Sequence, residues 1–333
     1  MIPSLIIGDI HCTPQEIKDC ESLAELIVQT CKEYTPKRVI FMGDLYNNHD
    51  VVNTLTISYY TKLFSQIEDI VKSKPVVIVG NHDQYTPSIR HPHAMLSHTQ
   101  GAVVIDGPCR LDDLSCGMPY YYDPKEFIQE AVKLKEQNPD CETLWCHQTF
   151  DGAKLQEGFY AKDGVDQDAV PFKTIISGHI HGPTKMGKVL YVGAPRWRTL
   201  TDSEYEDRFL LLLGGKPVKI STNKVCKRIY KYEDRESTPC VIDIPEELLP
   251  KADIRVDIYG SPGYIKDRIV ELRAKYGVKY RTFPISSRIS KVSESQGVSK
   301  AFDTYCEMFK PPFGSKVESL IESFKERSNG LRL

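Results

Sequence analysis

Short apolar runs that end at polar residues recur along this chain. The clearest run, 75–79, ends at Gly80 and is followed by Asn81, His82 and Asp83. A short, mostly β-branched run between Pro and Gly predicts a strand buried on both faces of an α/β sheet. Ligands bind at the carboxyl ends of such strands, so we expect these polar residues to border a site. Taken alone, the same residues are equally typical of a turn.

The pattern returns four more times, which favours a site over a turn. The runs 5–7, 38–42, 143–146 and 174–177 are each followed by Asp or His. The side chains that these four runs add to the set are Asp9, His11, Asp44, His147, His179 and His181. We therefore expect the polar residues of all five runs along one edge of the sheet.

Apolar residues at helical spacing lie between the strands. A capped helix start at Thr13–Glu16 precedes an apolar face over about 14–33. A second helix is expected from Leu55 to Ile70, which gives a β-α-β-α-β order and a largely parallel sheet. The further expected elements are a loop over 84–100, strands at 102–105 and 116–122, a helix from 123 to about 137, and a long excursion over 148–172. The apolar run 209–213 is predicted to be a central strand of a second sheet.

The character of the sequence changes to charged and alternating around 222–240, which indicates a domain boundary. A half-solvated strand at 254–259, a helix at 264–276 and a strand at 279–285 predict a small α+β capping module. A Ser-rich linker then leads to two helices separated by Pro311-Pro312. The expected domains are 1–222, 223–290 and 291–333.

Composition narrows the class of protein. The 333 residues, 41% hydrophobic and 26% charged, are typical of a globular protein with one large and one smaller domain. No apolar run has the length of a membrane span and no signal-like segment precedes the first strand, so a cytoplasmic location is expected. The ten cysteines form no CxxC pair and are expected to be reduced. The net charge of −2 means that any nucleic-acid affinity must come from local patches.

Seven of the polar side chains are of types that bind metal ions. Two transition-metal ions need about this many N and O ligands if one carboxylate bridges them, and Asp44 is the natural bridge because it stands alone on its strand. A set without thiolate favours Mn²⁺, with Mg²⁺, Fe²⁺ and Zn²⁺ as alternatives. Two ions about 3.5–4 Å apart can hold a phosphate and lower the pKa of a bridging water. His82 is not needed as a ligand and is expected to protonate the leaving oxygen.

Five motifs, in this order, resemble those of the calcineurin-like metallophosphoesterases. They are Asp9-x-His11, Gly43-Asp44, Gly80-Asn81-His82-Asp83, His147 and Gly178-His179-x-His181. The resemblance implies a four-layer α-β-β-α sandwich of two mixed sheets with helices outside. It also implies one metal ion held by Asp9, His11, Asp44 and His181, a second held by Asp44, Asn81, His147 and His179, and His82 as the catalytic acid.

The segments 191–198 and 202–213 further resemble SbcD-like proteins, the bacterial and phage members of the meiotic-recombination-eleven nuclease family. This resemblance implies a DNA exonuclease or endonuclease of recombination and repair, a homodimer, and a coiled-coil ATPase partner of the SbcC/Rad type. The sequence departs from the family pattern after Asp44. There we expect His49 to replace a histidine that lies behind the ligands, and Asp83 is expected to support the ligands in the same way.

Candidate substrate contacts are Arg90, Arg196 and Arg198, whose guanidinium groups suit phosphate. Trp197 either stacks on a base or packs in the core. The histidines 91, 93 and 98 are expected on a surface loop and are left out of the metal set. Residues 264–291 carry eight Lys or Arg against two acids, a local net charge of +6, which suits either a DNA backbone or a solvated face.

Near the C-terminus, Val317, Leu320, Ile321 and Phe324 recur at helical spacing. After a linker, such a stripe favours docking in a groove of the ATPase over a place in this chain's own core.

Two other functions stay open. One is a phosphodiesterase of nucleotides or small molecules, and the other is a scaffold that has kept the fold without its metal ions. The complete ligand set together with His82 argues against the scaffold.

Overall fold

The computed structural model describes residues 2–112, 114–156, 158–205 and 207–285. These residues fall into two compact units. The first contains the chain up to Lys231 together with Asp243–Ile254, and the second contains Tyr232–Ile242 and the described residues from Arg255 onward. The predicted boundary after residue 222 lies before this change of unit, and the predicted C-terminal helices of 291–333 lie outside the described residues.

The first sheet of the first unit has the order β16-β15-β1-β2-β3-β6. Its strands are β1 (Ser4–Ile7), β2 (Arg38–Phe41), β3 (Val76–Ile78), β6 (Val103–Ile105), β15 (Phe209–Leu213) and β16 (Val218–Ser221). The four strands β1, β2, β3 and β6 are parallel, as predicted. The prediction that 209–213 belongs to the second sheet is wrong, because β15 pairs antiparallel with β1. An apolar run indicates burial on both faces and does not identify the neighbouring strand.

The second sheet has the order β13-β14-β12-β9-β8-β7. Its strands are β7 (Cys109–Asp112), β8 (Ser115–Gly117), β9 (Thr143–His147), β12 (Thr174–Gly178), β13 (Thr184–Met186) and β14 (Val189–Tyr191). The four inner strands are parallel and the two outer ones antiparallel, so both sheets are mixed.

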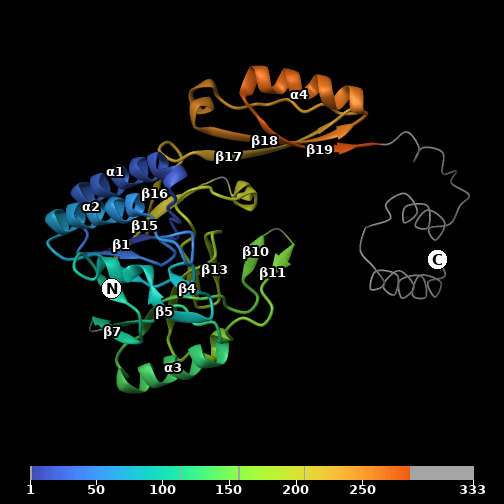
Figure 1. Cartoon of the computed structure of the whole chain (residues 1–333). Helices are drawn as coiled ribbons and strands as arrows, with labels where there is room; N and C mark the ends of the chain where they lie inside the picture. Colours follow the sequence, from blue (N-terminus) through green and yellow to red (C-terminus); the bar gives the residue numbers. More distant parts are fainter. Residues whose placement is uncertain (1, 113, 157, 206, 286–333) are drawn as a thin grey trace, which may run out of the picture. The chain divides into compact units, whose positions relative to one another are not determined.

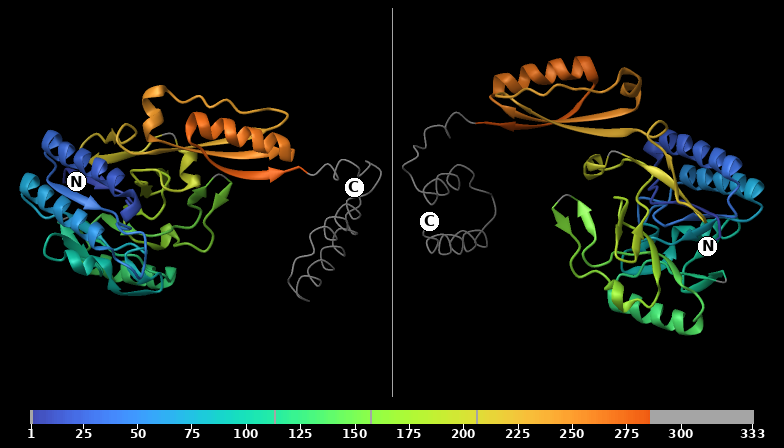
Figure 2. Two further views of the ribbon diagram at one scale, coloured as in Figure 1. Left: turned by 45° about the horizontal axis from the view of Figure 1, so that its top comes forward. Right: turned by 180° about the vertical axis from the view of Figure 1, so that it is seen from behind.

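Helices cover the outer face of each sheet (Figure 1). The helices α1 (Ile17–Tyr34) and α2 (Thr54–Val71) lie side by side on the first sheet, and α3 (Pro124–Gln137) lies on the second (Figure 2). Alternate residues of β1 serve the two faces: Leu5 and Ile7 pack in the core under the helices, whereas Ile6 packs in the core between the sheets. The predicted α-β-β-α sandwich is confirmed.

Two segments expected to lack regular structure contain strands. Residues 84–100 form a hairpin of β4 (Gln84–Thr86) and β5 (Ile89–His93), followed by the 3₁₀ helix Ala94–His98. The excursion 148–172 contains the hairpin of β10 (Lys154–Gln156) and β11 (Phe159–Tyr160). Pro92 inside β5 hid the first hairpin, because proline argues against a strand.

A three-stranded sheet with the order β17-β18-β19 follows, made of β17 (Arg228–Arg235), β18 (Ala252–Gly260) and β19 (Lys279–Pro284). The helix α4 (Pro262–Tyr276) starts at Ser261, whose side chain accepts a hydrogen bond from the Tyr264 amide, and ends at Gly277 in the left-handed conformation. The predicted helix and last strand are confirmed. Among the described helices, none has the length and apolar character that crossing a bilayer requires.

Candidate dinuclear metal centre

The predicted ligands lie where strands of both sheets end. Asp9 and His11 follow β1, Asp44 follows β2, and Asn81 follows β3 in the first sheet. His147 ends β9 and His179 follows β12 in the second sheet. The expectation of one sheet edge is therefore wrong, because the centre spans the carboxyl ends of two facing sheets.

Asp44 lies between two groups of histidines. Its Oδ2 is 3.5 Å from His11 Nε2 and 3.3 Å from His147 Nε2. Its Oδ1 accepts a hydrogen bond from the His82 amide at 2.8 Å. A single buried carboxylate thus faces both groups, which is the place expected of a bridging ligand.

The first group consists of Asp9, His11 and His181, whose ligand atoms lie within 4.8 Å of one another. The Nε2 atoms of His11 and His181 are only 3.0 Å apart. Asp9 Oδ2 accepts a hydrogen bond from the His179 amide at 2.7 Å, whereas Asp9 Oδ1 is buried with no hydrogen-bond partner among the described residues. A cation would satisfy that oxygen.

The second group surrounds Asn81 Oδ1, which lies 3.0 Å from His147 Nε2 and 2.7 Å from His179 Nδ1. The two imidazole nitrogens are 3.2 Å apart. His147 Nδ1 donates to the Met42 carbonyl at 2.7 Å, which leaves the Nε2 lone pair facing the group. Nitrogen lone pairs and an amide oxygen so close together suit a shared metal ion.

The close packing shifts the pKa values of Asp9, His147 and His179. Burial raises the pKa of Asp9 to about 6, with His147 opposing the shift. Burial alone would lower the pKa of His147, but the carboxylates of Asp44 and Asp9 outweigh it and raise the value to about 9. Burial and the neighbouring His147 lower the pKa of His179 to about 3. The donor set of carboxylates, imidazoles and one amide, without thiolate, therefore fits metal cations, whose charge would replace these conflicting interactions.

Three of the proposed ligands have left-handed backbone. The φ angles are 48° at His11, 50° at Asp44 and 78° at His179. Such angles are uncommon for residues with a side chain and cost about 1–2 kcal/mol each. Strained backbone of this kind is concentrated at functional sites.

Glycines allow the loops to approach one another. A Cβ on Gly80 would lie 2.3 Å from Asp44 Oδ1 and 2.4 Å from the Asp44 amide nitrogen. A Cβ on Gly178 would lie 2.5 Å from the Met42 carbonyl oxygen. The glycine before each of these two ligand motifs is therefore required by packing.

His82 lies beside the first group. Its ring centre is 4.8 Å from that of His11, and the His49 ring stacks on its other side at 4.7 Å. His82 Nδ1 donates to the Asn47 carbonyl at 2.8 Å, so Nε2 is the nitrogen available to a substrate. His49 thus lies behind His82 and does not join any of the ligand groups.

Asp83 is fully buried and ties two ligand loops together. It accepts hydrogen bonds from the Gly80 amide at 3.0 Å and the Tyr46 amide at 3.1 Å. Burial and the nearby Asp44 raise its pKa to about 7. Its role in this structure is to hold the loop after β3 against the loop after β2.

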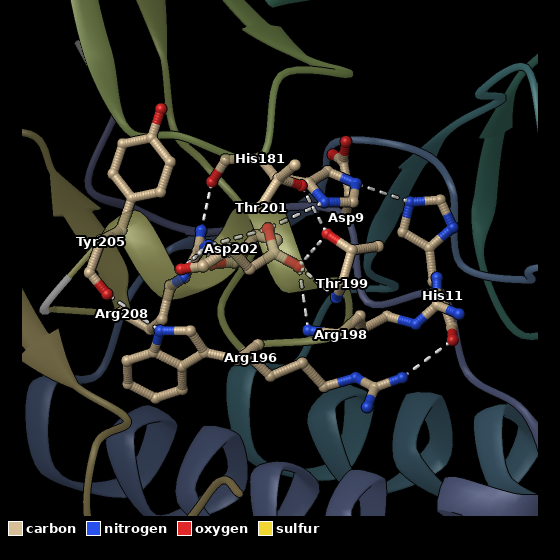
Figure 3. A network of polar contacts seen from close by, with 12 residues as sticks. Asp9, His11, His181, Arg196, Arg198, Thr199, Thr201, Asp202, Tyr205 and Arg208 are labelled. Atoms are coloured by element: carbon tan, nitrogen blue, oxygen red, sulfur yellow. Dashed lines mark hydrogen bonds and ion pairs between the residues drawn. The ribbon is translucent and has the colours of Figure 1, made fainter. Parts of the chain in front are cut away.

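Asp202, from the 3₁₀ helix Leu200–Glu204, is a site residue that sequence reasoning missed (Figure 3). Its Oδ1 lies 3.2 Å from His181 Nδ1 and 2.9 Å from Arg208 Nη2. Although burial raises the pKa of Asp202, the hydrogen bond and charge of His181 outweigh that effect and hold it well below its usual range. A carboxylate that orients a ligating imidazole in this way raises its affinity for metal. Nothing in the local sequence distinguishes Asp202 from neighbouring acids.

Arg196 is not placed to bind substrate, which corrects the prediction made from sequence. Its side chain is only 1% exposed and donates to the Ile10 carbonyl at 2.8 Å. It also donates to the His11 carbonyl at 2.8 Å (Figure 3). It also pairs with Glu16 at 3.0 Å and Asp19 at 3.3 Å. Arg196 therefore holds the loop that carries the first ligands.

The other candidate contacts differ from Arg196. Arg198 is 15% exposed and donates to Asn47 Oδ1 at 2.8 Å, beside the loop that holds His82. Arg90 lies over the Tyr121 ring and pairs with Glu126 at 3.3 Å, and neither of these partners belongs to the predicted ligand set. Trp197 is 2% exposed and donates to the Tyr205 carbonyl, so it packs in the core.

Two of the three histidines expected on a surface loop are buried. His98 bonds through Nε2 to the Tyr46 hydroxyl at 2.6 Å, and His93 is 5% exposed. His91 is exposed, as expected. The prediction of a surface loop over 84–100 failed because the β4–β5 hairpin in this segment was not recognised.

The model of the calcineurin-like phosphoesterase family matches residues 2–183, and the chain belongs to this family of metal-dependent phosphoesterases. The chain is also 24% identical over 171 residues to exonuclease subunit 1 of Enterobacteria phage T4. The match covers 50% of this chain and 49% of the phage protein. The family predicted from the five motifs is confirmed, and the phage relative supports the resemblance to SbcD-like proteins.

Proposed function

We propose that this protein is a two-metal-dependent DNA nuclease that hydrolyses phosphodiester bonds. The observation that carries the proposal is the position of Asp44, whose Oδ2 faces His11 at 3.5 Å and His147 at 3.3 Å. The ligands of the two ions are those expected from the motifs: Asp9, His11, Asp44 and His181 for one, and Asp44, Asn81, His147 and His179 for the other. Mn²⁺ suits this N and O set best.

The residues of the chain have distinct parts in the reaction. Bound cations would polarise the phosphate and acidify a water. His82 Nε2 is free to give a proton to the leaving oxygen, since Nδ1 is held by the Asn47 carbonyl. Arg198 is the arginine best placed to neutralise the phosphate, because it lies beside the same loop and keeps some exposure. Asp202 and Arg208 position His181.

The choice of DNA rests on the similarity to the phage relative and on the segments that resemble SbcD-like nucleases. The phage relative is named an exonuclease subunit, a name that fits a complex with other chains. We infer that the partner is a coiled-coil ATPase bound by the helices predicted in 291–333, and that the nuclease acts as a homodimer in recombination and repair. Truncation before Ser315 should abolish co-purification with the ATPase. Retained co-purification would refute this docking.

Among the described residues of the second unit, two of the cations counted in the sequence are held in ion pairs. Arg268 pairs with Asp234 at 2.7 Å and with Glu271, and Arg281 pairs with Asp257 at 2.6 Å. A role in tracking DNA would therefore rest on residues such as Lys266, Arg273 and Lys275.

The test is hydrolysis of long duplex DNA with Mn²⁺, compared with hydrolysis of bis-p-nitrophenyl phosphate and of cyclic nucleotides. His82→Ala should lower DNA hydrolysis about 100–10,000-fold while manganese binding persists. Asp69→Asn, an exposed change on α2, is the matched control and should act as wild type. Turnover of nucleotides without turnover of DNA would favour a nucleotide phosphodiesterase. Failure to bind manganese would favour a scaffold.

A further inference from the structure

A second cluster of metal-binding side chains lies apart from the ligands described above. It consists of His91 and His93 on β5 and Asp106, which follows β6. One ligand atom from each of the three residues lies within 4.8 Å of those from the other two. None of them belongs to the proposed catalytic centre.

The imidazole of His93 is an unexplained buried polar group. Its side chain is 0% exposed, and neither ring nitrogen has a hydrogen-bond partner among the described residues. Its Nε2 lies 3.5 Å from Asp106 Oδ2, which is long for a hydrogen bond. Leaving such a group unsatisfied costs about 1–3 kcal/mol. A buried histidine whose Nδ1 has no partner in the described part of the chain and whose Nε2 makes only a long contact with Asp106 therefore suggests a ligand.

The second imidazole lies close to the first, because the ring centres of His91 and His93 are 5.0 Å apart. His91 and Asp106 are exposed, so both side chains are free to rotate toward a common centre. To form bonds of about 2.0–2.2 Å to one cation, the three ligand atoms would need to move only slightly toward one another.

We propose that His91, His93 and Asp106 form a binding site for a single Zn²⁺ ion. Two imidazoles and one carboxylate give three ligands of the kinds that zinc prefers, with water in the fourth position. The hard cations Mg²⁺ and Ca²⁺ prefer all-oxygen sites, so two imidazoles select against them.

The position of the site gives it a structural consequence. His93 pairs with Gln84 across the β4–β5 hairpin, and the Ala94 amide donates to the Asp83 carbonyl at 2.7 Å. A zinc ion would connect this hairpin to the end of β6. It would thereby brace the segment that leaves the Asn81–Asp83 loop.

The test counts zinc per chain in untagged, full-length protein that has been stripped with a chelator, reloaded with Zn²⁺ and freed of excess metal. Wild type and the control Asp69→Asn should retain one equivalent more than His91→Ala and Asp106→Asn. The two altered residues are exposed, so these variants are expected to fold. His93→Ala is a further variant, and its circular dichroism shows whether loss of zinc reflects loss of fold.

A second measurement locates the ion. Zinc should slow hydrogen exchange in residues 84–93 of wild type and leave that segment unchanged in His91→Ala. Equal zinc content in wild type, His91→Ala and Asp106→Asn would overturn the proposal, whatever the result of the nuclease assays. Unchanged exchange in residues 84–93 of the zinc-loaded wild type would also overturn it.

Discussion

Arg196 and Arg198 stand two residues apart, and the structure gives them opposite roles that a pair of substitutions can separate. Arg196 is buried and bonds to the carbonyls of Ile10 and His11, whereas Arg198 is partly exposed beside the His82 loop. The perturbation is Arg196→Met against Arg198→Met. Methionine keeps an apolar stem of similar length and removes only the guanidinium.

The expected loss of stability depends on which groups lose their hydrogen-bond partner when the guanidinium is removed. Arg196→Met leaves two buried carbonyls without this donor, at a cost of about 1–3 kcal/mol each. Glu16 is 36% exposed and can recover water, so its loss adds about 0–1 kcal/mol. The expected total is about 2–7 kcal/mol, which spans the range for breaking a buried ion pair. At about 2–4 °C per kcal/mol, the Tm should fall by about 4–28 °C.

Arg198→Met should behave differently. Its hydrogen bond to Asn47 and its ion pair with Glu16 at 3.5 Å are both partly exposed, so the stability loss should be about 1 kcal/mol or less. A charged hydrogen bond to phosphate is worth about 1.5–3 kcal/mol, so without it kcat/KM for DNA should fall about 10–150-fold.

The assays are thermal unfolding followed by circular dichroism and DNA hydrolysis at saturating Mn²⁺ at a temperature where both variants are folded. A Tm of Arg196→Met close to that of wild type would refute the structural role assigned to its hydrogen bonds. An unchanged kcat/KM in Arg198→Met would refute its role at the phosphate.

Four further results are expected. Asp202→Asn should weaken Mn²⁺ binding about 10–100-fold in a calorimetric titration, because His181 loses the carboxylate that orients it; unchanged affinity would contradict this. Gly80→Ala should disrupt metal binding, because its Cβ would meet Asp44 at 2.3 Å, whereas Gly263→Ala, which meets nothing within 4 Å, should bind metal like wild type. Burial raises the pKa of Asp234, but hydrogen bonds from Tyr264 and Arg268 outweigh it and lower the value. The stabilising contribution of the Asp234 carboxylate is therefore present above about pH 4 and is lost as the pH falls through the lowered pKa. Asp234→Asn should speed hydrogen exchange in α4 at pH 7, and the variant should differ less from wild type near pH 3. Replacing Lys266, Arg273 and Lys275 with Gln should make the slope of log K for DNA binding against log salt concentration shallower by about 0.9 for each phosphate that the variant no longer neutralises. An unchanged slope would exclude this face as a DNA contact.

The sequence was sufficient to predict the features that depend on neighbouring residues in the chain. The apolar runs that precede Asp9, Asp44 and Asn81 are strands, and their parallel order follows from the helices between them. The five motifs identified the family, and the structure brings their side chains together.

The errors concern strand pairing and side-chain contacts between residues that are far apart in the sequence. The apolar strand 209–213 was predicted to be buried, yet its pairing with β1 depends on hydrogen-bond partners far away in sequence. The sequence does not distinguish Arg196 from Arg198, and both pair with Glu16 in the folded chain. Only the hydrogen bonds of Arg196 to the Ile10 and His11 carbonyls and its ion pair with Asp19 separate the two. Asp202 was missed for the same reason, because its partner His181 is set by the fold.

The left-handed backbone at His11, Asp44 and His179 bears on how this protein changes over time. Glycine would adopt those angles with no steric penalty, so replacing any of the three should relieve strain in the metal-free chain. Random substitution would then drift toward glycine at these positions if the side chains had no use. If related sequences keep an imidazole or a carboxylate at all three strained positions, they retain ligands at the expense of stability, as a functional metal centre requires.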